Sequence, residues 1–113
     1  MTDACLFCRI LSREIPATII HENDHAVAFR DIDPKAPTHV LVIPRRHIGK
    51  LSDASREDEV LIGELVGRAA AIARELGLEN YRVVLNNGEG AGQSVFHLHF
   101  HLMGGRPFKW PPG

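Results

Sequence analysis

The sequence lacks the features that mark several specialised classes of protein. It has only two cysteines among 113 residues, so no disulfide framework can compensate for the small core of a chain this short. No apolar run approaches the roughly 18 residues of a membrane-spanning helix, and no basic segment followed by an apolar stretch opens the chain. We therefore expect a cytoplasmic protein with no membrane partner.

The chain also lacks an excess of charge of either sign. Thirteen Lys and Arg residues stand against fourteen Asp and Glu, which gives a net charge of -1. A protein that binds duplex nucleic acid normally carries a basic surplus, so we expect no such partner here. A nucleotide ligand stays compatible with this balance, because a local site can be positive in a neutral protein.

Length and composition fit one globular domain over residues 1–113, with a C-terminal tail over 106–113. Short apolar runs divided by turn residues predict its strands, and Pro16 ends a short helix predicted over residues 7–13. Asn23-Asp24 separates the first two strands and predicts an antiparallel hairpin. The predicted strands cover residues 18–22, 26–29, 39–43, 81–85 and 96–103.

The longest helix is predicted between Ser55 as N-cap and Gly77 as C-terminal stop, with Asp58 three residues after the cap. Apolar residues recur along it at helical spacing and form a wide stripe that can cover a sheet. The stripe consists of Leu61, Ile62, Leu65, Val66, Ala69, Ile72, Ala73 and Leu76. Strands, one long helix and further strands, in that order, predict an α+β fold with an antiparallel sheet.

Three histidines alternate within the last predicted strand. Because successive side chains of a strand point to opposite faces, His97, His99 and His101 share one face. The histidine face is a solvated surface, an incidental metal-binding stripe or a chemical site. We favour the third because the other face already anchors the strand through Phe96, Leu98, Phe100 and Leu102.

Histidine suits attack on phosphorus, since a neutral imidazole is nucleophilic near pH 7 and forms a reversible phospho-intermediate. A glycine-rich loop over residues 88–94 precedes the histidines, and glycine lets a backbone approach a phosphate closely. Such a loop by itself is equally an ordinary surface connection. Its position next to the histidines is what favours phosphate binding.

The run His97-Leu98-His99-Phe100-His101-Leu102-Met103 resembles the His-φ-His-φ-His-φ-φ signature of the histidine triad (HIT) superfamily, in which φ is apolar. This resemblance implies a five-stranded antiparallel sheet with one long and one short helix. Further segments resemble the histidine triad nucleotide-binding (Hint) branch. They are Ala36-Pro37-Thr38-His39, Ile43-Pro44, Gly92-Gln93-Ser94-Val95-Phe96 and the ending Trp110-Pro111-Pro112-Gly113.

By the same resemblance, His99 is the nucleophile, and the reaction passes through a nucleotidyl-histidine intermediate that water hydrolyses. The implied activity is that of a purine nucleoside phosphoramidase that needs no cofactor for catalysis. The phosphate oxygens would be held by His101, Gly92, Gln93 and Ser94. The imidazoles would be oriented and the protons handled by His97 and His39.

The resemblance further implies a nucleotide pocket. Asp31 falls where the family has a carboxylate on the ribose hydroxyls, although it is equally a turn residue before Pro34. Asn86 matches an asparagine near the phosphate and ribose, and asparagine is also common in turns. The apolar walls of the base pocket, each of which is equally ordinary core, would be Ile20, Phe29 and Ile32.

Two other functions stay open. A dinucleoside polyphosphate hydrolase from a neighbouring branch would use the same nucleophile on a phosphoanhydride, but the Trp-Pro-Pro-Gly ending argues against it. The second is a nucleotide- or metal-binding regulator with vestigial catalysis. The complete triad, together with Ser94 and His39, argues against a regulator.

The resemblance also implies a homodimer in which two five-stranded sheets join. Pairing would cover an edge strand and bury apolar helix surface. The tail of one copy would reach towards the active site of the other, where Trp110 would influence substrate choice. A disordered, proline-rich tail is the alternative.

Cys5 and Cys8 have Cys-x-x-Cys spacing, which lets two thiolates chelate one ion but leaves a tetrahedral zinc two ligands short. Some bacterial histidine triad proteins resemble this arrangement. In them the zinc is completed by a histidine after the Ile-Pro strand and the first triad histidine, which correspond to His47 and His97. Such a zinc would be structural. The alternative is that two small thiols merely pack beneath the first helix.

Overall fold

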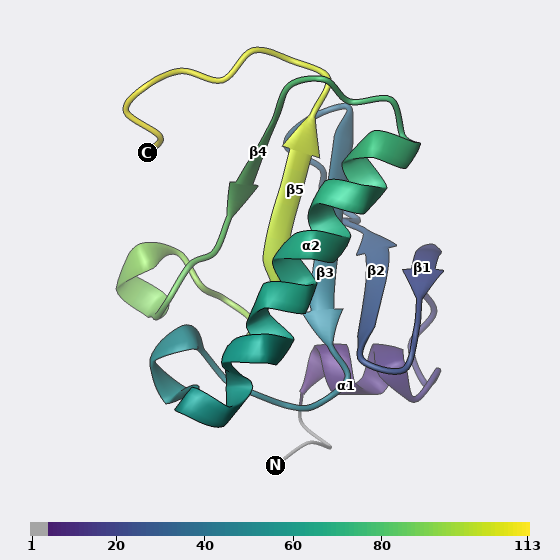
Figure 1. Ribbon diagram of the computed structural model, residues 1–113, viewed down its shortest axis with the longest axis vertical. Helices are drawn as coiled ribbons and strands as arrows, with labels where there is room; N and C mark the ends of the chain where they lie inside the picture. Colours follow the sequence, from purple (N-terminus) through teal and green to yellow (C-terminus); the bar gives the residue numbers. More distant parts are fainter. Residues whose placement is uncertain (1–4) are drawn as a thin grey trace.

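The computed structural model describes residues 5–113, which fold into one sheet with two helices (Figure 1). No helix in this part of the chain is long and apolar enough to cross a membrane. The helices are α1 (Leu6–Leu11) and α2 (Glu59–Glu75). The strands are β1 (Ile19–Glu22), β2 (Ala26–Arg30), β3 (Thr38–Pro44), β4 (Tyr81–Val84) and β5 (Phe100–Gly104).

The five strands form a single antiparallel sheet in the order β1-β2-β3-β5-β4. β3 is the central strand, and its pairing with β5 sets Leu41 opposite His101 and His39 opposite Met103. Residues that lie opposite one another on paired strands share a face. The predicted α+β fold is confirmed, and the sheet brings the histidine of β3 to the same face as the last triad histidine.

Both faces of the central strands are buried, because their side chains alternate between two apolar layers. Ala28 and Val42 point into the core beneath α2, whereas Phe29 and Leu41 point to the opposite face, where α1 packs. Figure 1 shows α2 running across one face of the sheet while α1 lies at one end of it. The two layers leave the histidines on the α1 side.

Helix α2 ends as the sequence predicts but begins at Glu59, because a 3-10 turn follows the predicted N-cap Ser55. The Ser55 N–H donates to the Asp58 carboxylate at 2.8 Å, which forms a capping box, and a 3-10 turn over Arg56–Asp58 leads into the helix. Gly77 follows the helix with a φ of +73°, a left-handed conformation that glycine adopts without strain. The buried part of the predicted stripe is Leu65, Ala69, Ile72 and Ala73, while Val66 and Leu76 are exposed.

The last strand is shorter than predicted. β5 begins at Phe100 and not at residue 96, because the preceding segment bonds to a loop: the Leu98 N–H donates to the Ile48 carbonyl at 2.6 Å. The apolar alternation is correct for Leu98 and Phe100, which lie in the core beneath α2. Phe96 departs from it, since 46% of its surface is exposed.

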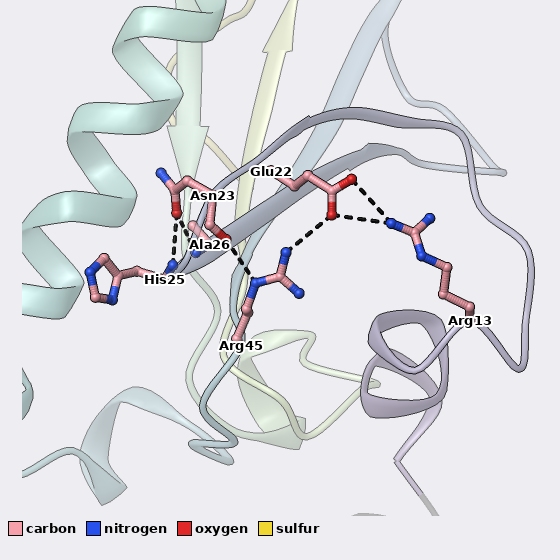
Figure 2. Close-up of polar contacts among 6 residues, drawn as sticks. All are labelled: Arg13, Glu22, Asn23, His25, Ala26 and Arg45. Atoms are coloured by element: carbon pink, nitrogen blue, oxygen red, sulfur yellow. Dashed lines mark hydrogen bonds and ion pairs between the residues drawn. The ribbon is translucent and has the colours of Figure 1, made fainter.

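The predicted β1-β2 hairpin is present, and its turn is held by a side chain. Asn23 Oδ1 accepts hydrogen bonds of 2.8 Å from the N–H groups of His25 and Ala26 (Figure 2). Glu22, just before this turn, lies between two guanidinium groups and pairs with Arg13 and Arg45 at 3.1 Å each. These contacts join the end of α1 to the hairpin and to the segment after β3.

Arg13 ends α1 in an uncommon conformation. Its φ is +68°, the only positive φ at a non-glycine residue among those described. The Arg13 N–H donates to Ile10 and the Glu14 N–H donates to Arg9, so the chain closes the helix in the manner usually found with glycine. A β-carbon in this conformation costs about 1 kcal/mol, whereas an exposed ion pair contributes about 0.2–1 kcal/mol.

These opposing effects predict different outcomes for two substitutions of Arg13. Arg13→Gly removes both the strain and the ion pair with Glu22, so we expect the free energy of unfolding to change by less than about 1 kcal/mol. Arg13→Ala loses the ion pair and keeps the strained β-carbon, so it should be about 1 kcal/mol less stable than the glycine variant. Urea denaturation would measure both. Equal stability of the two variants would contradict the strain.

Candidate active site

A cavity of about 530 Å³ opens on the α1 side of the sheet and collects most of the predicted site residues. A volume of this size is typical of pockets for small ligands. Its polar side is formed by Asp31, His39, Asn86, Ser94, His99 and His101, and the apolar side includes Phe29 and Ile32. Residues far apart in the chain thus meet in one concave surface that combines an apolar wall with convergent polar groups.

The hydrogen bonding of His99 leaves the lone pair of one of its nitrogens unused. His99 Nδ1 lies 2.7 Å from the backbone carbonyl of His97, and because a carbonyl only accepts, Nδ1 carries the proton. In the neutral ring Nε2 then bears the lone pair. His99 lines the cavity, and the Phe7 ring packs edge-on against it with centroids 5.0 Å apart. The ring is thereby fixed in one tautomer and orientation.

A second hydrogen-bond chain determines the tautomer of His101. The Lys35 backbone N–H donates to His39 Nδ1 at 3.0 Å, so His39 carries its proton on Nε2. This Nε2 lies 2.9 Å from His101 Nδ1 and donates to it. His101 therefore carries its own proton on Nε2. That N–H can donate to an anionic oxygen in the cavity.

Burial keeps these imidazoles neutral. It lowers the pKa of His101 to about 4, and the neighbouring His99 and His39 lower it further in the same direction. Burial also lowers the pKa of His99 and of His39, against the opposing effect of the nearby Asp31 carboxylate. Near neutral pH the site thus holds a neutral His99 imidazole beside hydrogen-bond donors.

Asp31 lies beside the histidines at the edge of the cavity. Its Oδ2 is 3.5 Å from His39 Nε2, and its Oδ1 accepts a 2.8 Å hydrogen bond from the Asp33 N–H. Asp31, His39 and His101 form a group close enough for a metal ion. The protonated His39 Nε2 has no lone pair to offer a metal ion. The hydrogen-bond pattern therefore favours a chain of hydrogen bonds from His39 to His101 over a metal site.

The glycine-rich loop contributes only part of what the sequence predicts. Ser94 and Asn86 line the cavity, whereas Gly92 and Gln93 do not. Gly92 has a φ of +99°, which turns the chain after a 3-10 turn over Glu89–Ala91. The Gln93 side chain is buried within the loop, so its predicted contact with phosphate oxygens does not agree with its position.

Ile20 also lies away from the predicted base pocket. The register of β1 shifts between Ile19 and His21, and this irregularity sends Ile20 to the core beneath α2 while Ile19 packs on the α1 side. Ile20 does not line the cavity. The resemblance assigned Ile20 to the pocket by its position in the sequence, and that position does not reveal a bulge, which reverses the face of the residues before it.

Sequence reasoning missed the wall that α1 provides. Leu6, Phe7 and Ile10 line the cavity, followed by Ile15 in the segment after the helix. The spacing of the three helical residues is that of an amphipathic helix. This spacing predicts burial but does not say whether the helix covers core or a cavity. Short helices with one apolar face most often pack on core, and this one packs on core and cavity together.

A second cluster of chemically active side chains lies behind the cavity. The Sγ atoms of Cys5 and Cys8 and the Nδ1 atoms of His47 and His97 all lie within 4.8 Å of one another. His97 is fully buried and does not line the cavity, so the structure assigns it to this cluster and separates it from the other two triad histidines. All four residues predicted as zinc ligands are brought together.

The separations within this cluster match those expected around a tetrahedral zinc. Zinc bond lengths of about 2.3 Å to sulfur and 2.0 Å to nitrogen place nitrogen pairs about 3.3 Å apart and sulfur–nitrogen pairs about 3.5 Å apart. His47 Nδ1 and His97 Nδ1 are 3.2 Å apart. Cys5 Sγ and Cys8 Sγ lie 3.4 and 3.5 Å from His97 Nδ1, and Cys8 Sγ lies 3.3 Å from His47 Nδ1.

The protonation of the cluster also suits a metal. His97 Nε2 lies 2.8 Å from the Pro44 carbonyl and must donate to it, which leaves the Nδ1 lone pair directed at the thiols. Burial lowers the pKa of His97 to about 4, so the ring is neutral. Burial, followed by the neighbouring Cys5, raises the pKa of Cys8 to about 11, so this thiol keeps its proton unless a cation replaces it.

Comparison with known proteins supports this fold. Residues 12–108 match the sequence family described as HIT domain. An uncharacterised HIT-like protein of Synechocystis sp. is 49% identical over 114 residues, with all of both chains covered. A HIT family hydrolase from Legionella pneumophila is 48% identical with a TM-score of 0.94, covering 96% of this chain and 99% of that one. A histidine triad nucleotide-binding protein from Candida albicans is 32% identical with a TM-score of 0.81, covering 96% and 83%.

Proposed function

This chain belongs to the HIT domain family, and on that basis we propose that it is a purine nucleoside phosphoramidase that acts through a nucleotidyl-histidine on His99. One observation carries the proposal: the His99 Nδ1–H donates to the His97 carbonyl, which leaves the Nε2 lone pair unused on a residue that lines a cavity of about 530 Å³. The relatives named as a HIT family hydrolase and as a histidine triad nucleotide-binding protein support the same class of activity.

The proposed reaction consists of two displacements at one phosphorus. In the first, the His99 Nε2 lone pair forms a bond to the α-phosphorus while the P–N bond breaks and its electron pair leaves with the amine nitrogen. That nitrogen must take up a proton as it departs, and we assign the Ser94 hydroxyl as the group that passes a proton to it from water while taking up another proton in exchange. In the second, water attacks the phosphorus, the Nε2–P bond breaks with its electron pair returning to Nε2, and the proton that water loses passes to solvent.

The groups around His99 stabilise the charge that the reaction develops. The His101 Nε2–H would donate to a non-bridging phosphate oxygen, and His39 holds His101 in the tautomer that makes this possible. His97 acts at one remove, because its carbonyl orients the nucleophile without touching substrate. Preorganised donors of this kind stabilise a transition state without reorganising during the reaction.

The same cavity has features that suit a nucleoside. Its apolar wall, which includes Phe7, Ile10 and Phe29, offers a surface on which a purine base can stack. Asp31 at the polar side can accept hydrogen bonds from both hydroxyls of a ribose, and Asn86 lies in the same lining. We therefore propose a purine nucleotide derivative as the substrate.

The decisive test supplies two substrates side by side. We expect the purified protein to release AMP from an adenosine phosphoramidate and to act on diadenosine polyphosphates at least about tenfold more slowly, because the leaving groups need different proton donors. Chromatographic quantification of AMP measures both rates. Turnover confined to the polyphosphates would overturn the phosphoramidase and favour a dinucleoside polyphosphate hydrolase. Binding of AMP without turnover of either would favour a regulator.

We also propose that Cys5, Cys8, His47 and His97 hold a structural zinc ion. The match between their separations and tetrahedral zinc geometry supports this, as does the direction of the His97 lone pair. When bound, zinc would supply the positive charge that keeps two thiolates together in a partly buried place. Cys5, Cys8 and His97 lie at the start of α1 and in the segment that leads into β5, so a bound zinc would join these two parts of the chain.

A homodimer is the third part of the proposal. β4 lies at an edge of the sheet, with Tyr81 and Val83 40% and 37% exposed, and such an edge invites pairing with another strand. On α2, Val60 and Val66 are exposed, and Gly67 has open space where a side chain would be. We expect sedimentation equilibrium at micromolar concentration to give twice the chain mass, and a monomeric mass would contradict pairing through this edge.

The tail runs beside this edge and would act in the same assembly. Phe108 lies between the guanidinium groups of Arg82 and Arg106, 5.2 and 4.2 Å from their carbons, and Arg82 also donates to the Lys109 carbonyl at 3.0 Å. Beyond it Trp110 is 83% exposed. Deleting residues 109–113 should change the preference among phosphoramidates with different amines, and an unchanged preference would contradict a role of the tail.

A further inference from the structure

Gln93 is buried in a loop in which residues 89–92 and Ser94 are exposed. Only 3% of its surface is exposed, whereas its neighbours Gly92 and Ser94 are exposed. Its side-chain Oε1 accepts a 2.8 Å hydrogen bond from the Gly88 N–H. Its Nε2 donates to the carbonyls of Gly49 at 2.9 Å and Val95 at 3.0 Å. A buried amide with three backbone partners stabilises one conformation of the loop.

These bonds leave Gln93 with nothing to offer a phosphate. A primary amide has two N–H donors, and both are occupied by carbonyls of the protein. Turning the amide towards the cavity would break both bonds and leave the carbonyls of Gly49 and Val95 without a hydrogen-bond partner. Each would cost about as much free energy as a lost hydrogen bond. Consistently, Gln93 does not line the cavity, while Ser94 and Val95 after it do.

The same bonds join the two ends of the loop and connect the loop to the segment after β3. The Gln93 backbone N–H donates to the Gly88 carbonyl at 3.0 Å, so backbone and side chain of Gln93 together satisfy both polar groups of Gly88. The bond to Gly49 then joins the loop to the segment after β3. A parallel connection runs from the Ser52 N–H to Asn87 Oδ1 at 2.8 Å. The stretch between Gly88 and Val95 is therefore held from inside by one side chain.

We propose that Gln93 is a positioning residue for the phosphate: its buried amide holds the loop of residues 88–95 in the conformation that presents Ser94 to the α-phosphate, without touching substrate itself. The inference rests on the proposed function, because it needs a phosphate in the cavity. It replaces direct contact of Gln93 with phosphate oxygens by an action through Ser94. Specificity for phosphate over an uncharged nucleoside is then a property of the loop's internal bonding.

The test compares two ligands that differ only in the phosphate. Gln93→Met keeps the length of the side chain and removes all three hydrogen bonds, so we expect the Kd for AMP to rise about tenfold while the Kd for adenosine changes less than twofold. Isothermal titration calorimetry measures both. A merely structural role would weaken both ligands alike. An unchanged Kd for AMP, or an equal loss for adenosine, would overturn the proposal.

A double-mutant cycle separates positioning from direct contact. If Gln93 acts through Ser94, adding Gln93→Met to Ser94→Ala should weaken AMP binding by less than about threefold, well short of its effect in the parent protein. Full additivity of the two substitutions would mean that Gln93 contacts phosphate independently and would overturn the proposal. A parent protein that binds neither AMP nor adenosine would overturn the proposed function as well, which distinguishes the two failures.

A second variant tests whether a loss of AMP affinity reflects unfolding of the protein. Gln93→Glu keeps the acceptor for Gly88 but sets a carboxylate oxygen against the carbonyls of Gly49 and Val95, so it should lower AMP affinity in the same selective way. Thermal denaturation and circular dichroism identify any variant that is unfolded. If both variants are unfolded at 25 °C, Gln93 serves global stability and the positioning role is wrong.

Discussion

Replacing His99 with alanine is expected to lower the turnover of an adenosine phosphoramidate by more than about a hundredfold while the Kd for AMP stays within a few-fold of the parent value. Removing a general catalyst costs about 10² to 10⁴ in rate, and removing a covalent nucleophile eliminates the route itself. Binding should persist because the apolar wall and Asp31 are unchanged. Single-turnover kinetics with phosphoramidate and calorimetry with AMP measure the two effects.

A matched control uses a histidine outside the cavity. His25 lies in the exposed β1-β2 turn, where only its backbone takes part in the hydrogen bonding, so His25→Ala should keep the parent rate. Retention of more than about a hundredth of the parent rate by the His99 variant would contradict nucleophilic catalysis. Trapping of a nucleotidyl group on the protein in acid-quenched parent samples, and its absence in the variant, would give independent support.

The second large effect is expected when the metal cluster is removed. Protein purified without an affinity tag or added metal should contain about one zinc per chain, and a Cys5→Ser/Cys8→Ser variant should contain almost none. Loss of a structural metal is among the largest single-site effects on stability, so the melting temperature should fall by more than about 5 °C. Elemental analysis and thermal denaturation measure the two quantities.

The position of α1 predicts a further consequence of zinc loss. The helix begins beside Cys5 and carries Cys8, while Leu6 and Phe7 line the cavity. Loosening α1 should therefore weaken adenosine binding as well as stability. A chelator supplies the control, because it should lower the melting temperature of the parent protein and leave the cysteine variant unchanged. Metal-free parent protein with full stability and activity would mean that the thiols are packing residues.

Local chemistry made much of the fold predictable. Ser55, Asp58 and Gly77 marked the ends of the long helix because caps and left-handed stops act within a few residues of where they stand. Asn23 marked the hairpin for the same reason. The uninterrupted apolar runs of β2 and β3 indicate burial on both faces.

The predictions failed where a contact between distant residues decides the outcome. Ile20 leaves the cavity because a register shift in β1 turns it to the core beneath α2, and Phe96 is exposed because β5 begins four residues later than predicted. The pattern of α1 predicts burial, yet nothing in it names a cavity as the surface covered. Gln93 was assigned to the phosphate, and only its bond to Gly49 reveals a different position.

The sequence by itself determined the α+β class, the end of the long helix and the candidate residues for phosphorus chemistry and for metal binding. These properties depend on periodicity, capping and residue type, all of which act locally. The tertiary structure decided how those residues divide: His99 and His101 face the cavity, while His97 turns to Cys5 and Cys8. The carbonyls of Pro44 and His97 then select the tautomers of His97 and His99, while His39 selects that of His101, and only the folded chain brings such partners together.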